Sequence, residues 1–128
     1  REFKLDVNNL PEIFTERLKL EQVFSNLISN AVKYSKPEKP HIEIKCEKIG
    51  NVYEFSVKDN GIGIDPEYHQ RIFEIFQTLR EKNEMESTGI GLAIVKKIID
   101  EQGETIHVQS KIGQGTEFTF TWRNTKAV

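Results

Sequence analysis

Apolar and polar residues alternate in five short segments of the chain, and this alternation predicts five β-strands. Successive side chains of a strand point to opposite faces, so a period of two lets one face be buried while the other meets water. The clearest case covers residues 51–59, where Tyr53, Phe55 and Val57 share the apolar face. The same pattern predicts the remaining strands at residues 3–7, 41–49, 104–111 and 115–123.

Two longer segments carry apolar residues at the spacing of an α-helix. Between about residues 17 and 34, apolar side chains recur every three or four positions and form one stripe along the predicted helix. A second apolar helix is predicted from about Ile90 to Gln102. The stripe of the first helix consists of Leu20, Val23, Phe24, Leu27, Ile28 and Ala31.

The middle of the chain is more polar than these segments. Pro66 opens a polar run that predicts a short helix, and residues 71–79 carry Phe73 and Phe76 at helical spacing. Residues 77–88 are charged and almost free of large apolar side chains, which predicts a mobile surface loop.

The order and segregation of these elements predict a single α+β domain over residues 1–128. The expected architecture is a two-layer α/β sandwich, with the helices on one face of a mixed, mostly antiparallel sheet. With 128 residues, of which 37% are apolar, the chain is large enough to form a hydrophobic core. Because the sequence begins at Arg1, without a Met and directly before a predicted strand, we expect it to be a fragment of a longer protein.

Composition narrows the class of partner. The net charge of −2 gives no indication of nucleic acid or another polyanion. No segment approaches the ~20 apolar residues that span a membrane. Cys46, the single cysteine, lies on the apolar face of a predicted strand, so we expect a buried free thiol, and this cysteine usage fits a reducing compartment.

Asp59 stands out because it continues the apolar face of the strand before it. Its carboxylate is therefore expected to point toward the buried side, where an unpaired charge is costly and needs a protein or ligand partner. Gly61 and Gly63 follow at once and let the backbone approach the same place closely. This combination predicts a pocket that reads a hydrogen-bond donor on a flat ligand.

The first predicted helix has an unusual polar face. Gln22, Asn26, Asn30 and Lys33 are spaced by four, four and three residues, so they share one side. Asparagine is a poor helix former, but amide oxygens beside an ammonium group suit a hydrated Mg²⁺ with phosphates. Tyr34 adds a flat, hydroxylated surface at the end of this face. A solvated helix face is the commoner fate of such residues and remains the alternative.

Two further signals are weaker on their own. Gly89 and Gly91 open the second predicted helix, where exposed N–H groups favour an anion, although glycine pairs also serve turns and close packing. The pattern is neither a dinucleotide fingerprint nor a Walker lysine motif. Thr116 is expected to point inward, where it could read a base edge together with Asp59. The alternative is a hydroxyl bonded to its own backbone near Gly115.

Taken together, these residues resemble the ATP-binding catalytic domain of sensor histidine kinases. The superfamily also includes gyrase, the ninety-kilodalton heat-shock chaperone and mismatch-repair ATPases, and the resemblance implies its Bergerat-type sandwich with a mobile ATP lid. Five motifs occur in the family's order and cover nearly the whole chain. They are the N box at residues 26–34, the first glycine box at 59–63, the F box at 71–76, the second glycine box at 89–91 and the final one at 115–118.

The resemblance implies a role for each matching position. Asp59, supported by Thr116, would read the adenine amino group. Asn30, helped by Asn26, would hold Mg²⁺, and Lys33 would meet the phosphates. The implied nucleotide-contacting positions are Asn26, Asn30, Lys33, Tyr34, Asp59, Gly61, Gly63, Gly89, Gly91, Leu92 and Thr116.

The resemblance also implies a lid over the nucleotide, formed by residues 77–88 with Gly89 and Gly91 as its hinge. Phe73 and Phe76 would anchor this lid or dock partner helices, and plain core packing is the alternative for both.

The chain departs from the family pattern near the lid and before the fourth strand. Ser87 replaces a common glycine, which would stiffen the hinge. Glu104 follows Gly103 where a second glycine is common, and we expect its side chain to face solvent. The two cations of the short lid, Arg80 and Lys82, can pair with phosphate or with neighbouring surface glutamates.

Asn26 distinguishes between two chemistries. Hydrolytic members of the superfamily carry a glutamate at this position, where it activates water as a general base. An amide cannot accept a proton near neutral pH. The resemblance therefore implies a protein-histidine kinase catalytic domain, which passes the γ-phosphoryl of ATP to a protein acceptor.

The acceptor is expected outside this chain. None of His41, His69 and His107 lies in an amphipathic helix followed by an acidic residue, as the family's phospho-accepting histidine does. The resemblance implies an acceptor histidine on a dimerisation domain of the same parent, with a response regulator as an indirect partner in two-component signalling. It also implies a monomeric fragment, a homodimeric parent and a cytoplasmic location. A catalytically inactive interaction module and a serine kinase of the same superfamily remain alternatives.

Overall fold

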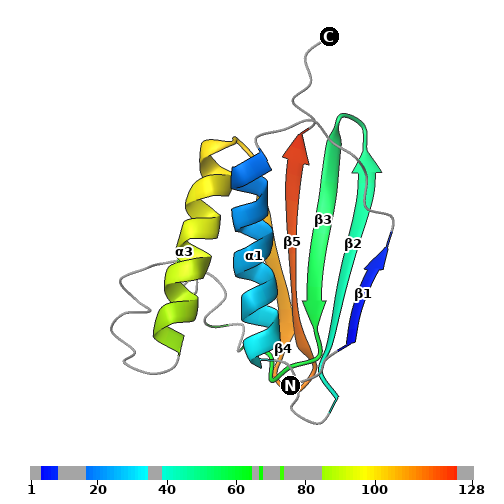
Figure 1. The fold of residues 1–128 in the computed structure, drawn as a ribbon, viewed down its shortest axis with the longest axis vertical. Coiled ribbons are helices and arrows are strands. Elements are labelled where there is room, and N and C mark those ends of the chain that lie inside the picture. The colour runs from blue at the N-terminus through cyan, green and yellow to red at the C-terminus, as the bar shows by residue number, and fades with distance from the viewer. Residues whose placement is uncertain are drawn as a thin grey trace.

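The computed structural model describes residues 4–8, 17–34, 39–64, 67, 73 and 85–123. Within these residues, two helices and a five-stranded sheet form two layers (Figure 1). The elements are β1 (Lys4–Asn8), α1 (Arg17–Tyr34), β2 (His41–Ile49), β3 (Val52–Asp59), α3 (Met85–Glu101), β4 (Ile106–Lys111) and β5 (Gly115–Arg123).

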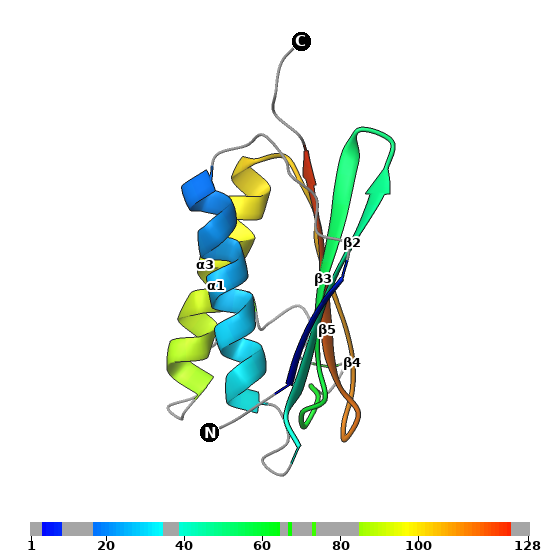
Figure 2. The ribbon, with the colours of Figure 1, turned by 45° about the vertical axis from the view of Figure 1, so that its right-hand side comes forward.

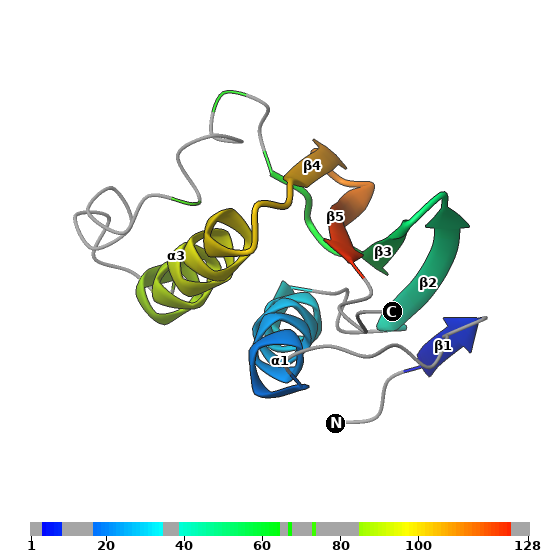
Figure 3. The ribbon, with the colours of Figure 1, turned by 90° about the horizontal axis from the view of Figure 1, so that it is seen from above.

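The sheet has the strand order β1-β2-β3-β5-β4. β1 pairs parallel to β2, whereas the other three pairings are antiparallel. Both helices cover the same face of the sheet, and none of the described elements covers the other face (Figure 2; Figure 3). This arrangement confirms the predicted α+β sandwich with a mixed, mostly antiparallel sheet.

The core lies between the two layers and is built by the apolar stripes that the sequence predicts. Val23 and Leu27 of α1 are fully buried. Phe24 meets Phe55 of β3 and Phe120 of β5 edge-on, with ring centroids 5.2 Å and 5.3 Å away. Full burial of an apolar side chain such as that of Val23 or Leu27 contributes about 1.5–3 kcal/mol to stability. This packing fixes α1 relative to β3 and β5.

The second helix begins earlier than the sequence predicts. α3 starts at Met85 rather than near Ile90, so residues 85–88 of the predicted lid are helical. Gly89 and Gly91 consequently lie inside the helix and not at its N-terminus. Each internal glycine costs about 1 kcal/mol relative to alanine. The buried apolar residues in the rest of α3 offset this cost by packing against α1 and the sheet.

Two side chains differ from their predicted environments. Glu104 was expected to face solvent, but its side chain is only 5% exposed. It accepts a hydrogen bond from the Thr121 hydroxyl at 2.7 Å and lies 3.3 Å from Nε of Arg123, and these partners hold it against the sheet. Cys46 is a free thiol as predicted, yet half-buried rather than buried, and burial raises the pKa of its thiol.

Candidate functional site

Asp59 ends β3 with its carboxylate directed inward, as its place in the alternating pattern predicts. The residue is 4% exposed. Its Oδ1 accepts hydrogen bonds from the backbone N–H of Gly61 at 2.8 Å and of Thr116 at 3.2 Å. The first bond comes from the glycine loop that follows β3 and the second from the start of β5. One carboxylate oxygen therefore joins two separate segments.

The electrostatics of Asp59 are dominated by its removal from water. Burial raises the pKa of this carboxyl, and the backbone donors of Gly61 and Thr116 oppose the shift. Both of those hydrogen bonds end on Oδ1, and no group in the described part of the chain donates to Oδ2. A buried oxygen without a donor is costly, which makes Oδ2 a natural acceptor for a ligand.

Thr116 is buried beside Asp59, as predicted, and its hydroxyl is bonded to another side chain. Its Oγ1 lies 2.9 Å from Oγ of Ser110 on β4. Both sequence interpretations of Thr116 omitted Ser110. The alternating pattern of the strand could have indicated Ser110, because its side chain is on the same inward face as those of Ile106 and Val108.

Glycines let the loop after β3 pack directly against the turn between β4 and β5. The N–H of Gly113 donates to the carbonyl of Ile62 at 2.7 Å. At Gly63, whose φ is +79°, a Cβ atom would lie 2.1 Å from the carbonyl oxygen of Lys111. At Gly115, with a φ of +96°, it would lie 2.1 Å from the carbonyl oxygen of Asp59. Gly63 is therefore required for contact with protein backbone, where the sequence suggested room for a ligand.

The polar face of α1 lies beside α3. Asn30 is 7% exposed, Asn26 is half-buried and Lys33 is exposed. A Cβ atom on Gly91 would lie 3.1 Å from Oδ1 of Asn26, so the two predicted motifs meet where the helices pack. Within the described residues, the side chain of Asn30 has no hydrogen-bond partner. A buried amide of this kind is suited to a ligand or a bound water.

Two predicted site residues belong to the core. Leu92 is 2% exposed and packs within the hydrophobic cluster. Phe73 is half-buried and meets Phe118 edge-on, with ring centroids 6.0 Å apart. Core packing was the alternative interpretation of Phe73. The side chain of Tyr34 and the surroundings of Gly89 are outside the description, as are residues 77–84 of the lid with Arg80 and Lys82, and Phe76.

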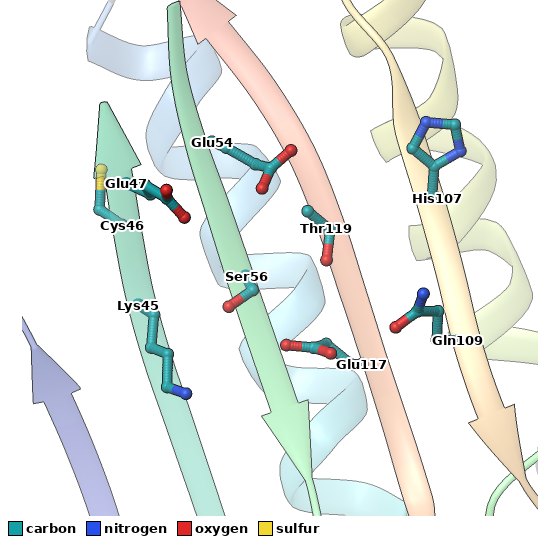
Figure 4. A pocket seen from close by; sticks show the side chains of 9 residues that line it. All are labelled: Lys45, Cys46, Glu47, Glu54, Ser56, His107, Gln109, Glu117 and Thr119. Carbon is teal, nitrogen blue, oxygen red and sulfur yellow. The ribbon is translucent and has the colours of Figure 1, made fainter. Parts of the chain in front are cut away.

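The open face of the sheet holds a separate hollow of about 680 Å³ (Figure 4). Its lining includes Glu54, Ser56 and Thr119, which point away from the helices. A second hollow, of about 500 Å³, lies at the end of β4 and β5. Its lining includes Ser110 and Thr116 as well as Gln109 and Glu117, which also line the first hollow, and it does not include Asp59. The candidate site is at this end of the sheet, because the buried acceptor groups of Asp59 and Thr116 lie together here.

Comparison with solved structures defines the class of protein. The structure of full-length ShkA in complex with AMPPNP matches with a TM-score of 0.79 and 32% identity, covering 99% of this chain and 26% of that chain. The catalytic domain of the histidine kinase ThkA matches with a TM-score of 0.77 and 28% identity, covering 98% and 81%. The sandwich is thus the ATP-binding type found in histidine kinases.

The chain belongs to the family described as "Histidine kinase-, DNA gyrase B-, and HSP90-like ATPase", whose model matches residues 15–126. Cyanobacterial phytochrome A of Nostoc sp. is 47% identical over 112 residues, which cover 88% of this chain and 15% of that protein. The sensor protein SrrB of Staphylococcus aureus is 39% identical over 102 residues, covering 78% and 17%. The chain therefore spans about a sixth of the length of these relatives.

Neither helix in the described part of the chain combines the length and apolar character needed to cross a membrane.

Proposed function

We propose that this domain binds Mg–ATP and transfers the γ-phosphoryl group to a histidine on a separate dimerisation domain of the same parent protein. The observation that carries the proposal is the buried Asp59, whose Oδ1 is held by two backbone N–H groups. Its Oδ2 has no donor within the described residues and suits the exocyclic amino group of adenine. The cytoplasm, as the compartment that holds ATP, is the proposed location.

The polar face of α1 supports a phosphate and metal site on the same side of the sheet. Asn30 offers an amide oxygen, the hard ligand that Mg²⁺ prefers, in a buried position without a partner among the described residues. Lys33 lies one turn further along and can meet phosphate oxygens. When bound, Mg²⁺ would neutralise phosphate charge. The residues present therefore fit the metal that the family implies.

Asn26 supports transfer to a protein acceptor over transfer to water. Its amide cannot take a proton from an attacking water, and its side chain packs against Gly91. In the proposed reaction, an imidazole nitrogen of the acceptor forms a bond to the γ-phosphorus while the bond to the β,γ-bridging oxygen breaks. ADP leaves with that electron pair. The protein's task is positioning and charge neutralisation, so the acceptor can lie on another domain.

The relatives support the signalling context. They include a protein named as a methanogenesis regulatory histidine kinase and the sensor protein SrrB. We propose that this domain serves a homodimeric sensor of the same kind and that the phosphohistidine passes its phosphoryl group to a response regulator. The isolated chain is proposed to be monomeric.

Phosphoryl transfer in trans tests the proposal. The chain is incubated with γ-phosphate-labelled ATP and Mg²⁺, alone and together with the histidine-containing dimerisation domain of the parent. We expect acid-labile label on the added domain, no label on the chain itself and little release of free phosphate. An Asn30→Ala chain should lose the transfer, because it lacks the proposed metal ligand.

Other outcomes would select other functions. Measurable ATP binding without any phosphohistidine would favour a catalytically inactive interaction module. Acid-stable label on a serine of an added protein substrate would favour a serine kinase. Stoichiometric acid-labile label on the isolated chain would contradict the proposed separation of nucleotide domain and acceptor.

A further inference from the structure

Ser110 occupies the junction between the glycine loop, the turn that joins β4 to β5, and Thr116. It lies on the inward face of β4 and is the register partner of Thr116 on β5. Its Oγ lies 2.6 Å from the backbone nitrogen of Ile64 and 2.9 Å from the carbonyl oxygen of Gly115. The third neighbour, Oγ1 of Thr116, is also 2.9 Å away.

The number of protons fixes the direction of these bonds. A serine hydroxyl has one proton to donate and two lone pairs with which to accept. The N–H of Ile64 can only donate, so it uses one lone pair of Ser110. The carbonyl of Gly115 can only accept, so it takes the serine proton. The remaining bond, between Ser110 and Thr116, must then be made with the proton of Thr116.

This assignment leaves only acceptors available to a ligand that binds beside Asp59 and Thr116. The hydroxyl proton of Thr116 is used on Ser110, and its backbone N–H is used on Oδ1 of Asp59. What Thr116 can still offer a ligand is a lone pair on Oγ1. An ionised carboxylate also accepts only, so Oδ2 of Asp59 presents the same polarity.

We propose that Ser110 is a positioning residue that gives the base pocket its specificity, because it withdraws the proton of Thr116 and makes the pocket select a base with an exocyclic amino group. This inference rests on the proposed function and deepens it. An amino group can donate two hydrogens to neighbouring acceptors, directly or through a water. Hypoxanthine has a carbonyl at the same position and one N–H donor, at the neighbouring ring nitrogen. Its carbonyl would face a lone pair, and its single donor could satisfy only one of the two buried acceptors, so the other would be left unpaired at a cost.

The experiment compares the affinity of the whole chain for ATP with its affinity for inosine triphosphate, which carries a carbonyl oxygen in place of the amino group. The wild-type chain should prefer ATP. In Ser110→Ala the proton of Thr116 becomes free to turn toward the pocket, so the preference for ATP should fall about fivefold to tenfold, the effect of one hydrogen bond. Ser110→Thr keeps a hydroxyl and should retain the preference.

A double-mutant cycle separates this role from simple support of the fold. In a Thr116→Val background the proton in question is absent, so Ser110→Ala should no longer change the ratio of the two affinities. Ser56→Ala is the matched control. It removes the same hydroxyl group from a serine on the opposite face of the same sheet (Figure 4). It should leave both affinities unchanged. If Ser110→Ala does not fold, Ser110→Cys keeps the shape with a weaker hydrogen-bonding group and should lower the ratio partly.

The possible failures are distinguishable. If Ser110→Ala weakens both nucleotides by the same factor, Ser110 only supports the fold and the inference is overturned, while the proposed function stands. If the wild-type chain binds neither nucleotide, the proposed function fails and the inference fails with it.

Discussion

At the scale of single residues, Asp59 combines an unfavourable environment with a specific arrangement of donors. Its burial raises the pKa of the carboxyl, and the N–H groups of Gly61 and Thr116 compensate only in part. Both donors hold Oδ1, so the orientation of Oδ2 is fixed before any ligand arrives. A preorganised acceptor of this kind loses little freedom on binding, which favours affinity.

Replacing the carboxylate by the amide of the same shape tests this acceptor. In Asp59→Asn, an NH₂ group can take the place of Oδ2 and would then oppose the amino group of adenine. We expect the binding free energy of ATP to weaken by about 1–3 kcal/mol, or about 5- to 150-fold in affinity. Isothermal titration of the folded chain with Mg–ATP measures the change.

Asp100→Asn is the matched control for this substitution. Asp100 lies on α3, and its exposed carboxylate pairs with Lys96 at 2.8 Å. The same chemical change there should leave ATP affinity unaltered. Equal affinities of the wild-type and Asp59→Asn chains for ATP would refute the assignment of the base pocket.

At the scale of elements, the site depends on how closely the loop after β3 approaches the turn between β4 and β5. A Cβ atom on Gly63 would overlap the carbonyl oxygen of Lys111, and a Cβ atom on Gly115 would overlap the carbonyl oxygen of Asp59. Hydrogen bonds from Gly113 to Ile62 and from Ile64 to Ser110 close the same contact. The loop and the turn therefore form one unit that orients Asp59 and Thr116.

Gly63→Ala should disrupt this unit. The new Cβ atom would lie 2.1 Å from the carbonyl oxygen of Lys111, on a residue whose φ is +79°. Gly113 is the matched control: its φ is +84°, but nothing lies within 4 Å of a Cβ atom placed there. Alanine at Gly113 should cost about 1–2 kcal/mol of unfolding free energy for the left-handed conformation alone.

Urea denaturation should show a larger loss for Gly63→Ala than for Gly113→Ala, because the backbone of one segment must also move. ATP affinity should fall in Gly63→Ala as well, since Asp59 is held by the displaced loop. Equal losses of stability in the two variants would mean that the close approach of loop and turn contributes nothing beyond the backbone conformation.

The same elements show which features a sequence can predict. Alternation and helical spacing are local properties, and the bounds predicted for α1 and for the strands agree with the structure within two residues. The start of α3 was predicted too late in the sequence, because Ser87, Thr88 and the two glycines that follow have low helix propensity. Tertiary packing stabilises the helix there despite this local preference. Ser110 was missed because its contact with Ile64 joins residues 46 positions apart. The inward direction of Asp59 was predictable, but its two backbone donors were not.

In the whole molecule, the proposed binding groups and a stabilising cluster lie at opposite ends of the sheet. Asp59 and Thr116 lie where β3 ends and β5 begins, while Val52 at the other end of β3 pairs with Arg123. The two ends of β3 are seven residue-to-residue steps apart, which corresponds to about 23 Å. The distal end contains the buried side chain of Glu104 with its partners Thr121 and Arg123. Stability and nucleotide binding should therefore be separable.

Glu104→Ala tests this separation. Loss of the acceptor for the Thr121 hydroxyl and of the partner of Arg123 should lower the free energy of unfolding by about 1–3 kcal/mol. The affinity of the folded chain for ATP should remain that of the wild type. ATP at about 100 times its dissociation constant should then stabilise both chains by the same increment, about 2.7 kcal/mol. Denaturation curves with and without Mg–ATP measure both quantities, and a smaller increment in Glu104→Ala would show that the distal cluster is coupled to the nucleotide site.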